Sequence, residues 1–386
     1  MQAALKEIFP AAVLLVIWRG QTVLHKAYGY LDPDTRRLST RIDSLFDLAS
    51  LTKLFTASAF LRLVDSGAVS LETPVGEVIH EFNGERKIGS TEDPLLKVEL
   101  PVDARYTGQV VNLDEVTFRH LLTHTSGLAA WRSVYLVDHS PGDVPLPHYL
   151  PYQVRNWRIA AICSYDFAYP PGARLVYSDL GFILIGEAIE RISSMDLESF
   201  IHQAVCQPLG LRRTCFNPLA HGFSPNEIAP SEVCAWRDRR LVGEVDDENA
   251  AGLGGVAGHA GLFSTAEEVA RLGMMYRNNG SYAGQQVLAP LTVAEMTSQQ
   301  ASLEGQRRGL AWVLWTPDDC SCGSSFGPGS YGHTGFTGTS LWIDPHRDLL
   351  VVTLTNRVYH GRQSIPIQYF RPLLHDLVVE AVQNFE

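Results

Sequence analysis

One segment, residues 47–67, restricts the fold more than any other, because a helical apolar pattern carries a serine and a lysine in its first turn. Apolar side chains recur at helical spacing from Leu51 onward, and Gly67 is a natural stop for the helix. Ser50 and Lys53 lie three residues apart, so they share one face of such a helix. A cation is unfavourable near a helix N-terminus, where the dipole attracts anions. We therefore expect a core-packed helix that uses the amine of Lys53.

The pairing of Ser50 with Lys53 suits nucleophilic catalysis. An amine beside a serine hydroxyl prepares it to lose its proton, and Ser50 could then attack a carbonyl carbon. The Ser50 N–H at the helix start could also stabilise the resulting oxyanion, because N–H groups there are unpaired and the dipole is positive. Ser-x-x-Lys also arises by chance on solvated helix faces, so this segment alone leaves both interpretations open.

Length and composition limit the classes of protein and of partner. A chain of 386 residues exceeds one ordinary core and predicts two lobes or one large, elaborated domain. A hydrophobic content of 45% with 19% charged residues is typical of a globular protein. The formal net charge of −11 argues against nucleic acid or an anionic membrane as a partner, because both repel an acidic surface. We therefore expect a small-molecule or short-peptide substrate, while the oligomeric state stays open.

The apolar run near the N-terminus is predicted to be a strand. Ala12–Trp18 is too short to span a bilayer, and it lacks the basic start and the small-residue cleavage site of a signal peptide. Together with Thr22–Tyr30 it forms a strand pair around the turn at residues 19–21. We therefore expect no membrane span and a cytoplasmic location.

The rest of the chain carries recognisable helix and strand signals. Thr117 is predicted to cap a short helix, Phe118–His124, and Asp179 to cap an apolar helix, Leu180–Ile192. The last third of the chain favours strands followed by one amphipathic helix. The elements predicted there are the strands Leu310–Trp315, Thr339–Ile343 and Leu349–Thr355, and the helix Ile365–Phe385.

The cysteines and the paired histidines do not predict a metal site. The six cysteines form no disulfide framework, and free thiols are the default in a reducing compartment. Cys320 and Cys322 are close enough to clip a metal, but no second pair follows. His120 and His124 are four residues apart, and we favour a packed helix end because no third ligand adjoins them.

Two polar residues in loops are ambiguous by position alone. Tyr177 is either an ordinary packing residue or a phenol presented to a site. His259 lies in a glycine-rich run, residues 246–261, and we favour a hydrogen bond within the loop over a position lining a cleft. The run lacks the Gly-Lys-Ser/Thr ending of a phosphate loop, which argues against a nucleotide.

Three separated motifs, taken together, resemble the active-site motifs of the penicillin-recognising serine hydrolases. They are Ser50-x-x-Lys53, Tyr177-Ser178-Asp179 and His333-Thr334-Gly335, in the order and approximate spacing of that family. The chain resembles the branch that contains class C β-lactamases, D-alanyl-D-alanine carboxypeptidases and related serine esterases. Further runs look similar, so the resemblance covers nearly the whole chain; they are residues 121–128, 170–172, 247–250 and 258–263.

The resemblance implies an α/β (α+β) fold of the beta-lactamase/transpeptidase type. An antiparallel sheet would be flanked by helices, with a helical lobe inserted. Residues 1–75 and 262–386 would form the α/β lobe that carries the sheet, and residues 76–261 the mainly helical lobe. The active site would lie at the junction of the two lobes.

By motif match, the resemblance also implies roles for individual residues. Ser50 would be the nucleophile, with Lys53 and Tyr177 sharing proton transfer. The backbone N–H groups of Ser50 and Phe336 would form the oxyanion hole. The residues expected to contact substrate are Asp179, His333, Thr334 and Gly335. No metal and no cofactor are implied.

Two positions depart from the family pattern. Asp179 stands where Asn is usual, and a carboxylate near Lys53 favours the ammonium form, which shifts the task of the base toward Tyr177. His333 stands where Lys is usual, and an imidazole with an ordinary pKa of about 6.5 is mostly neutral at neutral pH. We therefore expect the charge of His333 to govern substrates that carry a carboxylate, with activity on them rising as the pH falls.

The leading hypothesis is a serine hydrolase that works through an acyl-enzyme at Ser50. Its substrate would be an ester, an amide or a D-amino-acid peptide. The alternative is a penicillin-binding or sensing module that is acylated but does not turn over. The two differ only in deacylation, which depends on the position of one water molecule.

Overall fold

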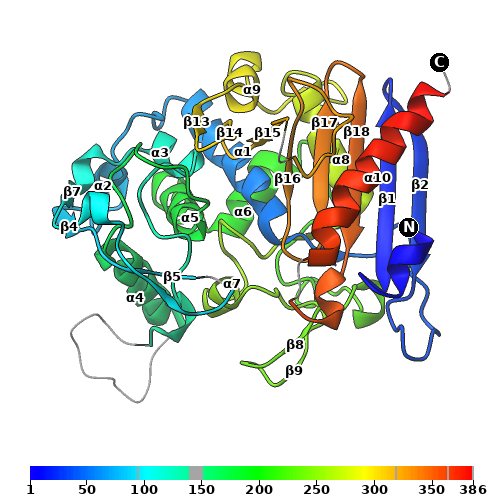
Figure 1. Cartoon of the computed structure of the whole chain (residues 1–386), viewed down its shortest axis with the longest axis horizontal. Helices are drawn as coiled ribbons and strands as arrows, with labels where there is room; N and C mark the ends of the chain where they lie inside the picture. The colour runs from blue at the N-terminus through cyan, green and yellow to red at the C-terminus, as the bar shows by residue number, and fades with distance from the viewer. Residues whose placement is uncertain (94, 139–150, 318–319, 363–364, 385–386) are drawn as a thin grey trace.

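The computed structural model describes residues 1–93, 95–138, 151–317, 320–362 and 365–384. Its main sheet has eight antiparallel strands, and most of it lies in the right half of Figure 1. The strands of this sheet are β1 (Ala11–Trp18), β2 (Gln21–Gly29), β13 (Ala301–Leu303), β14 (Gln306–Arg308), β15 (Val313–Leu314), β16 (Tyr331–Thr334), β17 (Ser340–Asp344) and β18 (Leu349–Thr355). They are arranged in the order β13-β14-β15-β16-β17-β18-β1-β2. Strands from both ends of the chain are therefore neighbours in one sheet.

Helices cover the sheet and fill the middle of the chain (Figure 1). They are α1 (Thr52–Asp65), α2 (Val75–Val78), α3 (Phe118–Leu122), α4 (Pro151–Ser164), α5 (Asp179–Ser193), α6 (Leu197–Ile201), α7 (Glu248–Gly252), α8 (Ala266–Arg277), α9 (Pro290–Thr297) and α10 (Ile365–Gln383). No helix in the described residues is both long enough and apolar enough to span a bilayer.

Short two-stranded ribbons complete the described structure. They are β3 (Phe46–Asp47) with β10 (Phe263–Ser264), β4 (Glu85–Lys87) with β7 (Val110–Asn112), β5 (Thr91–Glu92) with β6 (Glu99–Leu100), β8 (Val233–Cys234) with β9 (Arg239–Arg240), and β11 (Ser281–Tyr282) with β12 (Gln285–Gln286). Most of them lie in the segment between β2 and α8, which also carries α2 to α7. The expected division into lobes at residues 75/76 and 261/262 stays a prediction.

The apolar run of β1 is buried on both faces, which explains why it does not alternate with polar residues. Alternate side chains from Ala11 onward join the core beneath α8, which packs on β1, β17 and β18. Those from Ala12 onward join the core beneath α10. Successive side chains of a strand point to opposite faces of the sheet. A strand covered by helices on both faces therefore has apolar residues at nearly every position of its sequence.

The predicted strands of the sheet form, and one of them is much shorter than predicted. The N-terminal strand pair forms as expected, and the last strand spans Leu349–Thr355. The predicted strand Leu310–Trp315 is reduced to Val313–Leu314. Ala311 has a φ of 66°, and a residue in the left-handed region cannot continue an extended strand.

Two of the cysteines are bonded to each other. Cys320 and Cys322 form a disulfide with their Cα atoms 5.1 Å apart, so the expectation of six free thiols is wrong. The remaining four are free: Cys163, Cys206, Cys215 and Cys234. The paired cysteines are only two residues apart, so a local turn is enough to bring their sulfur atoms together.

Candidate active site

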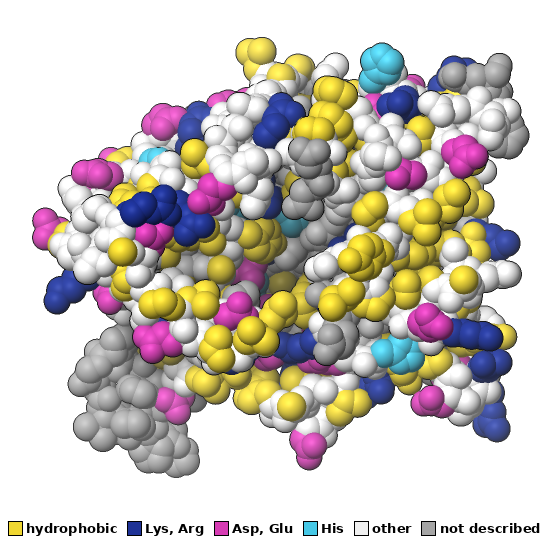
Figure 2. Space-filling model, viewed as in Figure 1, with side chains coloured by type: hydrophobic (Ala, Val, Ile, Leu, Met, Phe, Trp, Pro, Cys, Tyr) yellow, Lys and Arg dark blue, Asp and Glu magenta, His cyan; other side chains and the backbone are white. Residues whose placement is uncertain are grey.

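Ser50 lies in a turn that leads into α1. A 3-10 turn, Ala49–Leu51, precedes the helix, so α1 begins at Thr52 and not at Ser50 as the pattern predicts. The Asp47 carboxylate accepts a hydrogen bond from the Ala49 N–H at 2.8 Å and holds this turn. Ser50 borders a cleft of about 650 Å³, and Figure 2 shows one face of the molecule hollowed at its centre.

Lys53 makes three polar contacts that connect the first motif to the second. Its Nζ donates to Ser50 Oγ at 3.0 Å and to the backbone oxygen of His259 at 3.0 Å. It also forms an ion pair with Asp179 Oδ1 at 2.7 Å. Two of these contacts are hydrogen bonds and the third is an ion pair, and the side chain is fully buried. The geometry is that of a charged lysine in a fully partnered site.

Asp179 keeps Lys53 charged. Burial by itself lowers the pKa of Lys53, but the Asp179 carboxylate and the Tyr177 hydroxyl outweigh burial and raise this pKa above its ordinary value. The carboxylate is available because Ser178 caps α5 in its place, accepting a hydrogen bond from the Gly181 N–H at 3.4 Å. The expected cap at Asp179 is therefore wrong, and the residue occupies the first turn of α5.

Charged and aromatic side chains enclose Tyr177. Its ring centre lies 4.8 Å from Lys53 Nζ and 4.5 Å from the centre of the His124 ring. The buried guanidinium of Arg308 lies 5.7 Å from the ring centre. Within the described residues no group forms a well-aligned hydrogen bond to Tyr177 Oη, although Lys53 and Ser50 are close enough to lower its pKa. Burial has the larger effect and raises this pKa, so the phenol is neutral at rest.

The two histidines of the α3 segment face different partners. His124 Nδ1 accepts a hydrogen bond from the Ser178 N–H at 3.1 Å and so holds the second motif in place. Burial lowers the pKa of His124 well below its ordinary value, and the imidazole is neutral. His120 Nδ1 instead accepts a hydrogen bond from the Thr117 N–H at 3.2 Å. The predicted packed helix end is confirmed for this pair.

His333 is harder to protonate than its ordinary pKa predicts. Its side chain is 2% exposed, and its Nδ1 donates to Thr334 O at 2.9 Å. Burial, together with the positive charges of Arg308 and Lys53, lowers the pKa of His333 well below its ordinary value. The imidazole is therefore neutral near pH 7, as expected, but it gains a proton only at a lower pH than an ordinary histidine would. That its charge governs carboxylate-bearing substrates stays a prediction.

The third motif ends in a turn that is attached to the segment before Ser50. Thr337 Oγ1 donates to Asp47 O at 2.7 Å, and Thr339 Oγ1 donates to Leu48 O at 2.9 Å. A Cβ atom at Gly335 would lie 2.4 Å from Leu48 O, so this close approach requires glycine.

This attachment brings Phe336 to the cleft that Ser50 borders. Within the described part of the chain, no hydrogen bond uses the N–H of Ser50 or of Phe336. Two unengaged N–H groups at one cleft are the elements from which an oxyanion hole is built.

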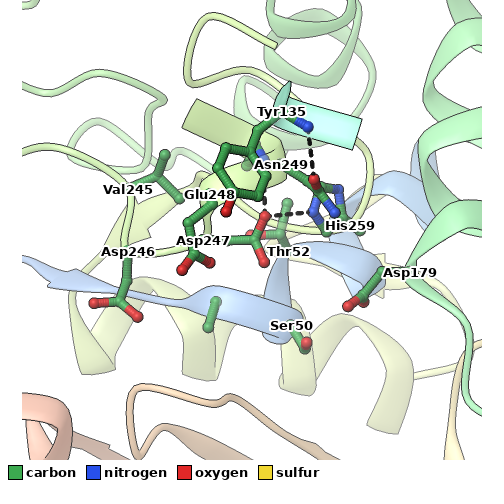
Figure 3. Close-up of polar contacts among 12 residues, drawn as sticks. Ser50, Thr52, Tyr135, Asp179, Val245, Asp246, Asp247, Glu248, Asn249 and His259 are labelled. Carbon is green, nitrogen blue, oxygen red and sulfur yellow. Dashed lines mark hydrogen bonds and ion pairs between the residues drawn. The ribbon is translucent and has the colours of Figure 1, made fainter. Parts of the chain in front are cut away.

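A second polar pair supports Lys53, and sequence reasoning did not place it in the site. His259 Nε2 lies 2.8 Å from Asp247 Oδ1 (Figure 3). Asp247 also caps α7 by accepting a hydrogen bond from the Ala250 N–H at 2.7 Å. Burial raises the pKa of Asp247, but His259 and the Ala250 N–H outweigh burial and hold it well below its ordinary value. The pair fixes the loop whose His259 carbonyl receives the Lys53 ammonium, and a capping Asp before a glycine-rich run is the sequence signal for it.

Side chains of both charges line the cleft. The cationic ones are Lys97, Arg174 and Arg362, and the anionic ones are Asp179, Asp246, Asp247, Glu248 and Glu304. Arg174 pairs with Glu304 at 2.8 Å, and Arg362 pairs with Glu248 at 2.6 Å. Across the described ranges, no group of three or more His, Cys, Asp or Glu side chains is arranged to hold a metal ion.

Replacing Asp179 with asparagine should change the pH dependence of hydrolysis. The substitution removes the anion that raises the pKa of Lys53, while the burial that lowers this pKa remains. If charged Lys53 is the active form, the alkaline limb of kcat/KM should move to lower pH. The measurement is kcat/KM for a neutral p-nitrophenyl ester between about pH 6 and pH 10, with Asp179→Glu as the control that keeps the charge.

The pH profile of Asp179→Asn also shows whether uncharged Lys53 is the active form. An acidic limb that moves to lower pH in Asp179→Asn, with activity rising near neutrality, would make uncharged Lys53 the active form. The neutral ester excludes any effect of Asp179 on the charge of the substrate.

Comparison with known proteins identifies relatives over most of the chain. A family model described as Beta-lactamase matches residues 2–370. A protein of Salmonella agona, provisionally named D-alanyl-D-alanine carboxypeptidase, is 31% identical over 372 residues, which cover 90% of this chain and 79% of that protein. A protein of the same provisional name from Salmonella enteritidis has the same identity and coverage.

Solved structures share the fold at lower sequence identity. EstCE1, described as a hydrolase with promiscuous acyltransferase activity, has a TM-score of 0.68 at 20% identity and covers 97% of this chain and 96% of its own. Simvastatin synthase from Aspergillus terreus has a TM-score of 0.68 at 19% identity, covering 97% and 95%. An octameric penicillin-binding protein homologue from Pyrococcus abyssi has a TM-score of 0.65 at 22% identity, covering 95% and 74%. The expected fold type is confirmed.

Proposed function

The chain belongs to the beta-lactamase family and is a serine hydrolase, and we propose that Ser50 is the residue acylated when it cleaves an ester, an amide or a D-amino-acid peptide. The observation that carries this proposal is the contact of 3.0 Å between Lys53 Nζ and Ser50 Oγ, at the border of a cleft of about 650 Å³. A hydroxyl that faces an open cleft and is held by a buried ammonium is prepared for nucleophilic attack.

In the proposed acylation, Tyr177 relays the proton. Ser50 Oγ attacks the carbonyl carbon and gives its proton to Tyr177 Oη, while Tyr177 gives its own proton to the leaving group. This relay suits a neutral phenol beside a charged Lys53, because no buried group changes its charge. In deacylation, water attacks the acyl carbon and the relay runs in reverse, returning a proton to Ser50 Oγ.

The proposed oxyanion hole consists of the N–H groups of Ser50 and Phe336. Both are unengaged in the described part of the chain, and the turn that carries Phe336 is attached to the segment before Ser50. Asp179, His333, Thr334 and Gly335 are the proposed substrate contacts. His333 would take part as a neutral side chain, since burial depresses its pKa.

The relatives narrow the proposed substrate class to acyl compounds of small molecules or short peptides. Those named as D-alanyl-D-alanine carboxypeptidases support peptides that end in D-alanine as the first class to test. The absence of nucleic-acid partners and a cytoplasmic location stay predictions.

The test of the proposed function uses three acyl donors with the purified protein. They are a p-nitrophenyl ester, nitrocefin and a D-alanyl-D-alanine peptide, followed through both the burst and the steady state. We expect a burst equal to the enzyme concentration followed by turnover on at least one donor. A burst without turnover would instead support the acylated, non-hydrolysing module. Neither burst nor turnover, with no fluorophosphonate labelling of Ser50, would overturn the proposal.

A further inference from the structure

Arg371 is a buried cation that lies against the turn carrying Phe336. It lies on α10, is 9% exposed, and has no carboxylate partner among the described residues. Its Nη2 donates to two backbone oxygens, Gly335 O at 2.7 Å and Thr339 O at 3.0 Å. Burial, with a smaller contribution from the charge of Arg357, lowers the pKa of Arg371 to about 9. A buried ion without a counter-ion is costly, so an apolar residue would be the more stable choice at this position.

The contact with Gly335 acts on the same peptide unit that holds the Phe336 N–H. Peptide bonds throughout the described residues are trans, so the C=O and N–H of this unit point in opposite directions. Arg371 therefore holds one end of the unit. The N–H leaves from the other end, on the residue that lines the cleft.

We propose that Arg371 is a positioning residue for the oxyanion hole: it fixes the direction of the Phe336 N–H and strengthens it as a donor. The proposal rests on the proposed acylation of Ser50. A positive charge at the carbonyl oxygen draws electron density through the planar amide and makes the N–H a better donor. The hydrogen bond from the Phe336 N–H is strongest when negative charge develops on the substrate oxygen. The contact of Arg371 therefore stabilises the transition state more than the bound substrate.

The neighbouring contacts hold the turn in place, but none of them brings a charge to Gly335 O. Arg357 Nε donates to Phe336 O at 2.6 Å, but that oxygen belongs to the next peptide unit. The threonines at 337 and 339 attach the turn to Asp47 and Leu48. The peptide unit of the Phe336 N–H has one further contact in the turn, because the Gly338 N–H donates to Gly335 O at 3.1 Å. Gly335 O therefore accepts two of the described hydrogen bonds, and Arg371 supplies the charged one.

The kinetic test compares Arg371→Met, which removes the charge, with Arg371→Lys, which keeps it. We expect the acylation rate constant for a p-nitrophenyl ester to fall about 10- to 10²-fold in Arg371→Met, with KM changed less than about threefold and Arg371→Lys intermediate. Binding of phenylboronic acid, whose adduct with Ser50 mimics the oxyanion, should weaken in proportion to the rate. Binding of the carboxylate product should not.

His375→Gln is the matched control for loss of packing by α10. His375 is buried one turn further along the same helix, and its Nδ1 donates to Ser321 O at 3.2 Å, away from the turn at 335–339. Its substitution should lower the melting temperature without changing the acylation rate or the affinity for boronate.

A spectroscopic test gives a readout that does not depend on activity. The sequence contains three Gly-Phe dipeptides, at 181–182, 222–223 and 335–336. Labelling with glycine carrying ¹³C at the carbonyl and with ¹⁵N-phenylalanine therefore gives three cross peaks. In Arg371→Lys and Arg371→Met the peak of 335–336 should shift, while the other two report an intact fold.

Two outcomes would overturn the proposal. One is a folded Arg371→Met enzyme whose acylation rate and boronate affinity stay within about twofold of the wild type. The other applies if Arg371→Met does not fold: an unshifted 335–336 peak in folded Arg371→Lys would then overturn the proposal. A wild-type enzyme that is not acylated at Ser50 would contradict the proposed function instead, and the peak shift would still test the contact of Arg371 with the turn.

Discussion

Ser50→Ala should reduce hydrolysis of a p-nitrophenyl ester by about 10⁴-fold or more and abolish labelling by a fluorophosphonate. The substitution removes the oxygen that is proposed to form the acyl-enzyme and that contacts Lys53 Nζ. The fold should be unaffected, because Ser50 is only half-buried and its Oγ accepts one hydrogen bond, from Lys53. The measurements are steady-state turnover, covalent labelling and thermal unfolding of the variant beside the wild type.

Ser66→Ala is the matched control for this prediction. It changes a serine at the other end of α1, whose Oγ donates to Leu63 O at 2.8 Å. This variant should keep both turnover and labelling. Near wild-type turnover in Ser50→Ala itself would show that the nucleophile has been assigned to the wrong residue.

Tyr177→Phe should lower kcat by about 10²-fold or more while leaving the fold intact. The hydroxyl is the proposed proton relay, and no well-aligned hydrogen bond within the described residues depends on it. Lys53→Ala should lower kcat on the same scale, because it removes the charge that holds Ser50 Oγ and faces the Tyr177 ring. The measurement is kcat and KM on a neutral ester, with thermal unfolding to monitor the fold.

The two variants differ in their expected effect on stability. Lys53→Ala leaves the Asp179 carboxylate without its buried partner and opens a cavity, so a lower melting temperature is expected. Lys53→Met fills more of that space and separates lost packing from lost charge. A Tyr177→Phe enzyme with wild-type kcat would make Lys53 the base despite Asp179.

The contact between Ser50 and Lys53 is the part of the site that the sequence predicts most directly. Residues three apart near a helix start are neighbours, whatever the rest of the chain does. The strand pair at the N-terminus and the last strand are predicted for the same reason, because their hydrophobic patterns are local. A pattern fails where one residue breaks it: the φ of 66° at Ala311 divides a run that would otherwise be one strand.

Contacts between distant segments required the tertiary structure. Asp179 pairs with Lys53 because Ser178 takes over the helix cap and α5 packs against α1. The local sequence predicts neither the identity of the cap nor the packing of the two helices, because Asp and Ser are equally good helix caps. The same holds for the backbone oxygen of His259, which reaches Lys53 through a loop held by Asp247.

Protonation states are decided by burial, which no motif encodes. The sequence identifies His333 by its place in the third motif and assigns it an ordinary pKa, but enclosure beside Arg308 and Lys53 keeps it neutral. Arg371 is the converse case. Helical spacing places this charge on the apolar face of α10, beside Phe370 and Leu374, which marks it as unusual. Only the packing of α10 on the sheet shows that it binds the carbonyl oxygen opposite the Phe336 N–H, because a hydrogen bond between segments depends on their positions in space.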